Sequence, residues 1–228
     1  KGSPKGRHIR CGIREQNMAG ISSGLATCGK IPVMATFDVF YNRMLDQIRQ
    51  SIAIPKVPVK MIGTHAGLGV EQDGSSHQSV SVPTYMAAMP NVNCWEPACA
   101  SETEEILDIM MESNEPEYIR LTRHPVEEID RDYKIVSGKG VYVVKEMPEP
   151  DVVFVGSGTM VQNCLEASKK LEKDGIYSKV ININNYGEAY SREDLENEIP
   201  PYVGVVAVQD ANPSLHRDII NRRLGRSN

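Results

Sequence analysis

The sequence lacks both a surplus of basic residues and any long uncharged hydrophobic run. Its 228 residues hold 25 Lys and Arg against 30 Asp and Glu, a formal net charge of −5. Because phosphate backbones bind to basic faces, we expect no nucleic-acid partner. The longest stretch without Asp, Glu, Lys or Arg, residues 74–95, contains Pro83, Pro90 and His77. Such a stretch cannot cross a bilayer, so we expect no contact with a membrane.

Several local motifs are absent as well. No apolar run follows the basic residues 1–10, so we predict no secretory signal and a cytoplasmic location. The five cysteines include no C-x-x-C pair, and we expect them to be small buried hydrophobes without disulfides. Neither a GxxxxGK[ST] phosphate loop, which ends in Ser or Thr, nor an HExxH site occurs. Residues 156–158, Gly-Ser-Gly, are better interpreted as a tight turn than as a dinucleotide motif.

What the sequence does contain is an alternation of helical and strand-like apolar patterns, which is typical of parallel sheets covered by helices. The first half predicts helices over residues 15–28, 38–52 and 101–113 and strands over residues 31–37, 57–64, 92–95 and 118–121. The second half predicts strands over residues 151–155, 179–183 and 203–209 and helices over residues 159–173 and 192–198. We therefore predict an α/β fold of two consecutive α/β/α units with mostly parallel sheets.

A polar stretch separates the two units. Residues 125–134 begin with a proline and are rich in Asp, Glu and Arg, which is typical of a linker. We therefore predict a first domain over residues 1–124 and a second domain over residues 135–228.

Three segments of the first unit carry the candidate chemistry. Residues 12–18 read GIREQNM, residues 35–43 read ATFDVFYNR, and residues 65–77 read HAGLGVEQDGSSH. In this order and spacing they resemble the pyrimidine-binding domain of the transketolase family, whose enzymes use thiamine diphosphate. The chain from residue 151 onward resembles the C-terminal domain of the same family. The resemblance is strongest to the C-terminal subunit of split transketolases.

Four residues are candidates for binding the cofactor. Without the resemblance, Glu15 would be a carboxylate that favourably meets a helix dipole, and Phe37 and Phe40 would be core residues. The resemblance implies that Glu15 is catalytic and hydrogen-bonds the pyrimidine ring of the cofactor. It also implies that Phe37 and Phe40 pack on that ring, with Arg43 at the rim.

A second set of candidates binds the sugar substrate. His65 and His77 flank a glycine-rich loop that offers too few ligands for zinc, and we assign no metal ligand to this chain. The resemblance implies that His65 and His77 are catalytic and, together with Asp73, hydrogen-bond the substrate. Arg123 would otherwise be an exposed surface charge. It resembles the family arginine that meets the substrate phosphate.

One family segment is missing from the sequence. The family holds the cofactor diphosphate through Mg²⁺ or a similar divalent metal bound to a GDG segment, and no GDG occurs among the 228 residues. The resemblance therefore implies a partner, an N-terminal transketolase subunit that carries the diphosphate and metal site. It also implies self-association into an α2β2 assembly.

The predicted activity is transfer of a two-carbon ketol unit from a ketose phosphate to an aldose acceptor. Residues 64–68 also resemble 1-deoxy-D-xylulose-5-phosphate synthase, but residues 121–124 fit transketolase better. The β subunit of a 2-oxoacid dehydrogenase is a further alternative within the fold. A non-catalytic subunit with the same fold is the alternative from another class.

Overall fold

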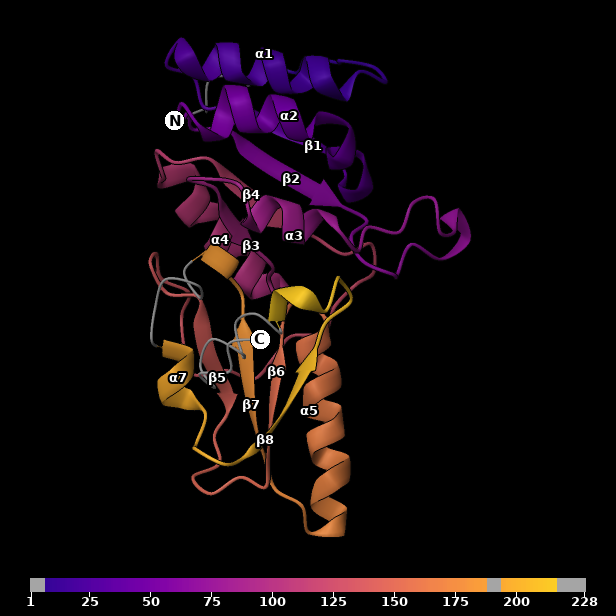
Figure 1. Ribbon diagram of the computed structural model, residues 1–228, viewed down its shortest axis with the longest axis vertical. Coiled ribbons are helices and arrows are strands. Elements are labelled where there is room, and N and C mark those ends of the chain that lie inside the picture. The colour runs from indigo at the N-terminus through magenta and orange to yellow at the C-terminus, as the bar shows by residue number, and fades with distance from the viewer. Residues whose placement is uncertain (1–6, 188–193, 217–228) are drawn as a thin grey trace.

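A computed structural model describes residues 7–187 and 194–216. Two α/β units lie end to end along the long axis, with the N-terminal unit at the top of Figure 1. The predicted fold of two α/β units with largely parallel sheets is confirmed. Across the described part of the chain, no helix is both long and apolar enough to span a bilayer.

The first unit has a four-stranded sheet in the order β1-β2-β4-β3. Its strands are β1 (Val33–Phe37), β2 (Lys60–Thr64), β3 (Asn93–Trp95) and β4 (Glu117–Arg120). All three pairings are parallel. The carboxyl ends of the strands therefore meet at one edge of the sheet, which is where open α/β sheets bind their ligands.

The helices of the first unit depart from the expected helices in two places. They are α1 (Glu15–Thr27), the consecutive helical turns η1 (Asp38–Met44), α2 (Leu45–Ile48) and η2 (Arg49–Ala53), the short turn η3 (Glu71–Asp73), α3 (Val82–Ala87) and α4 (Ala100–Glu112). The segment expected to be helical over residues 38–52 is helical over residues 38–53, but its geometry changes from 3₁₀ to α to π. The short helix α3 was not expected, whereas α4 agrees to within a residue with the helix expected over residues 101–113.

The second unit has a sheet in the order β5-β7-β6-β8. Its elements are β5 (Val141–Lys145), β6 (Val152–Gly156), α5 (Met160–Leu171), η4 (Glu172–Asp174), β7 (Ser178–Ile183), α7 (Asp194–Glu198) and β8 (Gly204–Val208). The sequence analysis missed β5, which pairs with β7 in the antiparallel direction. The start of the expected helix over residues 192–198 lies outside the described residues.

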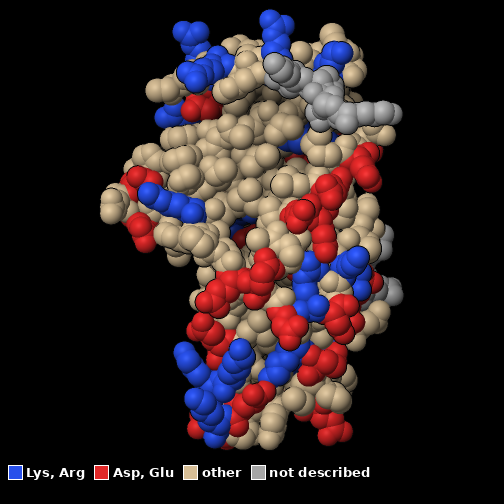
Figure 2. Space-filling view, turned by 180° about the vertical axis from the view of Figure 1, so that it is seen from behind, with Lys and Arg blue, Asp and Glu red and all other residues tan. Residues whose placement is uncertain are grey.

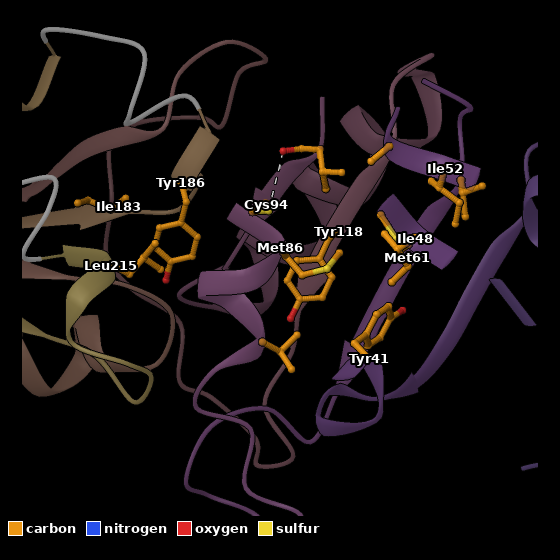
Figure 3. Close-up of a cluster of buried hydrophobic side chains, with 14 of the residues drawn as sticks. Tyr41, Ile48, Ile52, Met61, Met86, Cys94, Tyr118, Ile183, Tyr186 and Leu215 are labelled. Carbon is orange, nitrogen blue, oxygen red and sulfur yellow. Dashed lines mark hydrogen bonds between the residues drawn. The ribbon is translucent and has the colours of Figure 1, made fainter. Parts of the chain in front are cut away.

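The two units share one hydrophobic core. Figure 3 shows Tyr41, Met61 and Tyr118 of the first unit in the same cluster as Ile183 and Tyr186 of the second. The backbone continues this contact, because the Glu96 N–H donates to the Asn184 carbonyl oxygen at 2.8 Å. The two units therefore contact each other where β3 and β7 end.

The cysteines only partly match the expectation of burial. All five lie in the described ranges and are free thiols. Cys94, Cys99 and Cys164 are buried, as expected. The expectation is wrong for Cys28, which is exposed just after α1, and for Cys11, which is half-buried.

Candidate functional site

The candidate site lies at the carboxyl ends of β1 and β2. Phe37 is the last residue of β1 and pairs with Thr64, the last residue of β2. His65 follows at once with φ +56°, an uncommon left-handed conformation for a residue other than glycine. The segment between β2 and α3 then extends sideways from the first unit (Figure 1). Strand pairing thus places Phe37 and His65 next to each other.

Four aromatic rings form the wall of the site. His65 stacks on Phe37 with a centroid distance of 3.7 Å and an interplanar angle of 16°. Phe37 and Phe40 are nearly parallel, 6.0 Å apart. His77 presents its edge to Phe40 at 5.6 Å and to Phe37 at 6.4 Å. Offset and edge-to-face contacts of this kind are favourable, so the two histidines and two phenylalanines hold one another in place.

A carboxyl group and a guanidinium group lie beside this wall. Arg43 Nη1 donates to Glu15 Oε2 at 3.5 Å, and the guanidinium carbon lies 5.1 Å from the centre of the Phe40 ring. The Glu15 side chain is 12% exposed, whereas that of Arg43 is 55% exposed. Glu15 is thus largely withdrawn from water at the first residue of α1, and Arg43 lies at the rim.

The two histidines have similar surroundings. His65 Nδ1 lies 3.1 Å from the Thr64 hydroxyl oxygen, and His77 Nδ1 lies 2.9 Å from the Ser76 hydroxyl oxygen. In each case a hydroxyl of the preceding residue fixes the ring through Nδ1. We therefore take Nε2 as the ring nitrogen that can meet a substrate.

The remaining two candidates form a separate pair. Arg123 Nη1 lies 3.1 Å from Asp73 Oδ2 and donates to the Val70 carbonyl oxygen, also at 3.1 Å. Both side chains are about one third exposed, at 38% and 35%. The eight candidates therefore fall into two groups. One contact network joins Glu15, Phe37, Phe40, Arg43, His65 and His77, and an ion pair joins Asp73 to Arg123.

Sequence analysis missed a buried charged cluster beside this site. Arg120, the last residue of β4, contacts three carboxylates, those of Asp38, Glu96 and Asp210. Arg120 is 3% exposed, and Asp38 is fully buried. The available signal was a charged residue inside the otherwise buried strand β4, because a charge in such a place needs a partner.

The electrostatics of this cluster follow from burial. Burial raises the pKa of Asp38 and of Glu96, and the nearby Arg120 guanidinium opposes that rise in both. Tyr118 donates its hydroxyl hydrogen to Asp38, and Tyr186 donates its own to Glu96. The cluster is thus a hydrogen-bonded network in which one guanidinium serves three carboxyl groups.

The residues of the aromatic wall fit a flat heterocycle. A pyrimidine needs an apolar surface for its ring and a carboxyl group for a ring nitrogen. The Phe37–Phe40 pair supplies the surface, and Glu15 supplies a carboxyl group that is largely withdrawn from water.

Comparison with known proteins agrees with this geometry. The family model described as the transketolase pyrimidine-binding domain matches residues 1–127, and the model described as the transketolase C-terminal domain matches residues 141–213. The two units are therefore a pyrimidine-binding domain followed by a transketolase C-terminal domain. The chain belongs to the transketolase family.

Relatives cover most of this chain. A transketolase of Aquifex aeolicus is 34% identical over 220 residues, which is 91% of this chain and 32% of that protein. A protein of Methanocaldococcus jannaschii described as a transketolase C-terminal section is 33% identical over 179 residues, 77% of this chain and 56% of that protein. This chain thus spans about a third of the former and about half of the latter.

A solved structure supports the same relationship. The structure of a split-gene transketolase, described as an inactive β4 tetramer, superposes with a TM-score of 0.72 at 31% identity. The match covers 95% of this chain and 82% of that one.

Proposed function

We propose that this chain is the C-terminal subunit of a split transketolase and transfers a two-carbon ketol unit from a ketose phosphate to an aldose acceptor. The observation that carries the proposal is the Glu15 carboxyl group beside the Phe37–Phe40 wall, with His65 and His77 on that wall. The wall supports binding of a pyrimidine ring, and the histidines support binding of an oxygen-rich substrate. We propose that the two domains meet within residues 125–134.

The pyrimidine-binding domain implies thiamine diphosphate as the cofactor. The chemistry that this group supplies when bound is carbanion stabilisation. Phe37 and Phe40 would hold its pyrimidine ring, and Glu15 would share a proton with a ring nitrogen. Arg43, 3.5 Å from Glu15, would keep that carboxyl group oriented.

His65 and His77 act on the substrate in this proposal. A neutral imidazole can donate to one oxygen and, once protonated, can pass a proton on near neutral pH. With Nδ1 of each ring next to a hydroxyl group, Nε2 would donate to the carbonyl and hydroxyl oxygens of the sugar. Asp73 would accept from a sugar hydroxyl, and Arg123 would bind the terminal phosphate.

The diphosphate and its divalent metal belong to a partner subunit in this proposal. The M. jannaschii relative described as a C-terminal section and the split-gene structure both support a two-chain enzyme. Figure 2 shows a broad area of the first unit with few charged side chains, while charges crowd the second unit. Exposed hydrophobic residues of the first unit include Ile13, Ile31, Val33 and Ile54. Such surfaces suit protein contacts.

The donor substrate tests the proposal. The chain, copurified with its N-terminal partner and supplied with thiamine diphosphate and Mg²⁺, should transfer a ketol unit from a ketose phosphate. Pyruvate should not replace that donor. Use of pyruvate with glyceraldehyde 3-phosphate would instead favour the 1-deoxy-D-xylulose-5-phosphate synthase alternative. Turnover with neither donor would favour a non-catalytic subunit.

A further inference from the structure

The loop over residues 65–79 carries both candidate histidines, and its base is closed by backbone hydrogen bonds. The Ser79 N–H donates to the Gly67 carbonyl oxygen at 3.1 Å, and the Gly67 N–H donates to the Ser79 carbonyl oxygen at 3.3 Å. Between these two residues the chain extends away from the first unit (Figure 1). His65 lies just before Gly67 and His77 just before Ser79, so what holds these two closing residues also constrains where the histidines lie.

Arg120 holds this base from the first unit. Its Nη2 donates to the Ser79 carbonyl oxygen at 3.2 Å. The Ser79 hydroxyl donates to Asp38 Oδ2 at 2.5 Å, and Asp38 itself faces Arg120 Nε at 3.8 Å. Ser79 is thus bound through its backbone and its side chain to one buried ion cluster.

The second unit reaches the same place through the segment that follows β8. Arg120 Nη1 donates to Asp210 Oδ1 at 2.8 Å, and Arg120 Nη2 donates to the Asp210 carbonyl oxygen at 3.3 Å. Two residues later, the Asn212 N–H donates to the Val80 carbonyl oxygen at 2.7 Å. The loop base is therefore held between β4 of the first unit and the end of β8 of the second.

The approach of Asp210 to the loop leaves no room for a side chain. A Cβ built on Gly67 would lie 1.6 Å from Asp210 Oδ2, and Gly67 has φ +78°. The carboxylate thus lies directly against the backbone of the loop.

We propose that Arg120 and Asp210 are positioning residues that fix the 65–79 loop so that His65 and His77 face the pyrimidine site. This inference rests on the proposed function for its catalytic consequence, but not for its structural part. Asp210 makes the second unit a contributor to the geometry of the site. Their side-chain hydrogen bonds and ion pairs are with Asp38, Ser79, Glu96 and each other, not with the residues of the aromatic wall.

The test compares two variants that each weaken a contact between the units. Asp210→Asn removes one of the three carboxylate charges that Arg120 meets, and the Asp210 side chain is 16% exposed, so the variant can fold. Asn182→Ala is the matched control. Asn182 Nδ2 donates to Glu102 Oε1 at 3.0 Å, which also joins the two units but does not contact the loop.

Hydrogen exchange of the full chain measures directly whether Asp210 holds the 65–79 loop in place. Loss of a charge-assisted hydrogen bond should speed exchange in peptides that cover residues 65–80 by roughly tenfold or more in Asp210→Asn. The same peptides should be unchanged in Asn182→Ala. Unchanged loop exchange in Asp210→Asn, or equal acceleration in both variants, would overturn the proposal.

Kinetics of the complex with the N-terminal partner measure whether the position of the loop affects catalysis. Asp210→Asn should lower kcat/KM for the ketose phosphate by roughly tenfold, while the affinity for thiamine diphosphate stays within about twofold. The Asn182→Ala complex should keep both values. Normal kcat/KM in Asp210→Asn despite fast loop exchange would overturn the catalytic role. Fast loop exchange with no ketol transfer by the wild-type complex would support the positioning and refute the proposed function instead.

Discussion

Glu15 illustrates how the surroundings of a residue distinguish a helix cap from a site residue. A carboxylate in the first turn of a helix is stabilised by the helix dipole wherever it points. Glu15 is in addition largely withdrawn from water and paired with Arg43, whose guanidinium lies over the Phe40 ring. A residue that only capped α1 would need neither contact, so these contacts favour a role at the site.

Glu15→Gln should reduce ketol transfer by the assembled complex by roughly 10²–10⁴ while leaving the fold intact, because the amide cannot share a proton as the carboxyl group does. Glu104→Gln, at an exposed position of α4, is the matched control and should keep full activity. Turnover of the two variants at saturating cofactor gives the comparison. If Glu15→Gln kept more than roughly a tenth of wild-type turnover, the assigned role would be wrong.

Arg123 is paired with Asp73, and that pair does not prevent it from binding a phosphate. Exposed ion pairs contribute only about 0–1 kcal/mol. A hydrogen bond to a charged phosphate contributes about 1.5–3 kcal/mol. Since both side chains are about one third exposed, a substrate phosphate can displace Asp73 as the partner of Arg123.

Arg123→Ala should therefore lower kcat/KM for phosphorylated sugars roughly 10- to 150-fold, mainly through a higher KM. Unphosphorylated analogues serve as the control and should be almost unaffected. Arg123→Lys should restore part of the loss, since lysine keeps the charge without the planar fork. Equal losses for phosphorylated and unphosphorylated sugars would show instead that Arg123 only anchors the loop through Val70.

At the scale of the elements, a glycine in β2 makes room for the side chain of Asp38, the first residue of η1. Gly63 of β2 has no unusual backbone conformation, but a Cβ at this position would lie 2.2 Å from Asp38 Oδ1. Asp38 is fully buried and hydrogen-bonded to Ser79 and Tyr118, so it cannot move aside without losing these bonds.

Gly63→Ala should accordingly reduce the free energy of unfolding by about 1–3 kcal/mol through overpacking. Gly204→Ala provides the control, because Gly204 also lies in a strand, β8, and its Cβ would meet nothing within 4 Å. Urea unfolding of both variants measures the difference. Equal stability of the two variants would contradict the close contact between Gly63 and Asp38.

Much of the architecture could be predicted from the sequence because parallel strands have distinctive apolar runs. The strands ending at Phe37 and Thr64 set the position of the aromatic wall, and both were predicted. Strand β5 was missed although its sequence, VYVVK, is rich in the β-branched and aromatic residues typical of strands. The mixed helical geometry of residues 38–53 reflects tertiary packing that local propensity does not encode.

The candidate site was predictable only in part. The three motifs identify residues that the structure brings together, such as Glu15 and Arg43. They do not indicate that Asp73 pairs with Arg123, or that Asp210 of the second unit approaches the loop at Gly67. Contacts between residues so far apart in the chain, 50 positions in the case of Asp73 and Arg123, leave no periodic signal in a single sequence.

On the scale of the whole molecule, a buried histidine, His216, lies beside the shared core, with its ring 6.1 Å from that of Tyr186. Burial lowers the pKa of His216 from 6.5 to about 4. In the unfolded chain His216 regains its ordinary pKa, so unfolding takes up a proton between these two values. Its contribution to stability is complete above pH 6.5 and is lost as the pH falls towards 4. The buried Asp38 and Glu96, whose pKa values are raised, have the opposite dependence.

When the pH is lowered, the free energy of unfolding should therefore decrease less in His216→Leu than in the wild type. Between about pH 7 and about pH 5, His216 alone lowers that free energy by about 2 kcal/mol. Urea unfolding of both proteins at the two pH values isolates this contribution, because the carboxyl groups are common to both. The same pH dependence in the variant and the wild type would contradict burial of His216 in the neutral form.

The central claim is that this chain supplies the pyrimidine-binding half of a two-chain transketolase. Its most direct test is ketol transfer by the purified chain, with thiamine diphosphate, Mg²⁺, a ketose phosphate and an aldose, before and after addition of an N-terminal partner that carries a GDG segment. The account predicts no turnover by the chain alone and turnover that rises with the partner until the two are equimolar. Turnover by the chain alone would contradict it, as would an inactive complex that nevertheless forms and binds the cofactor.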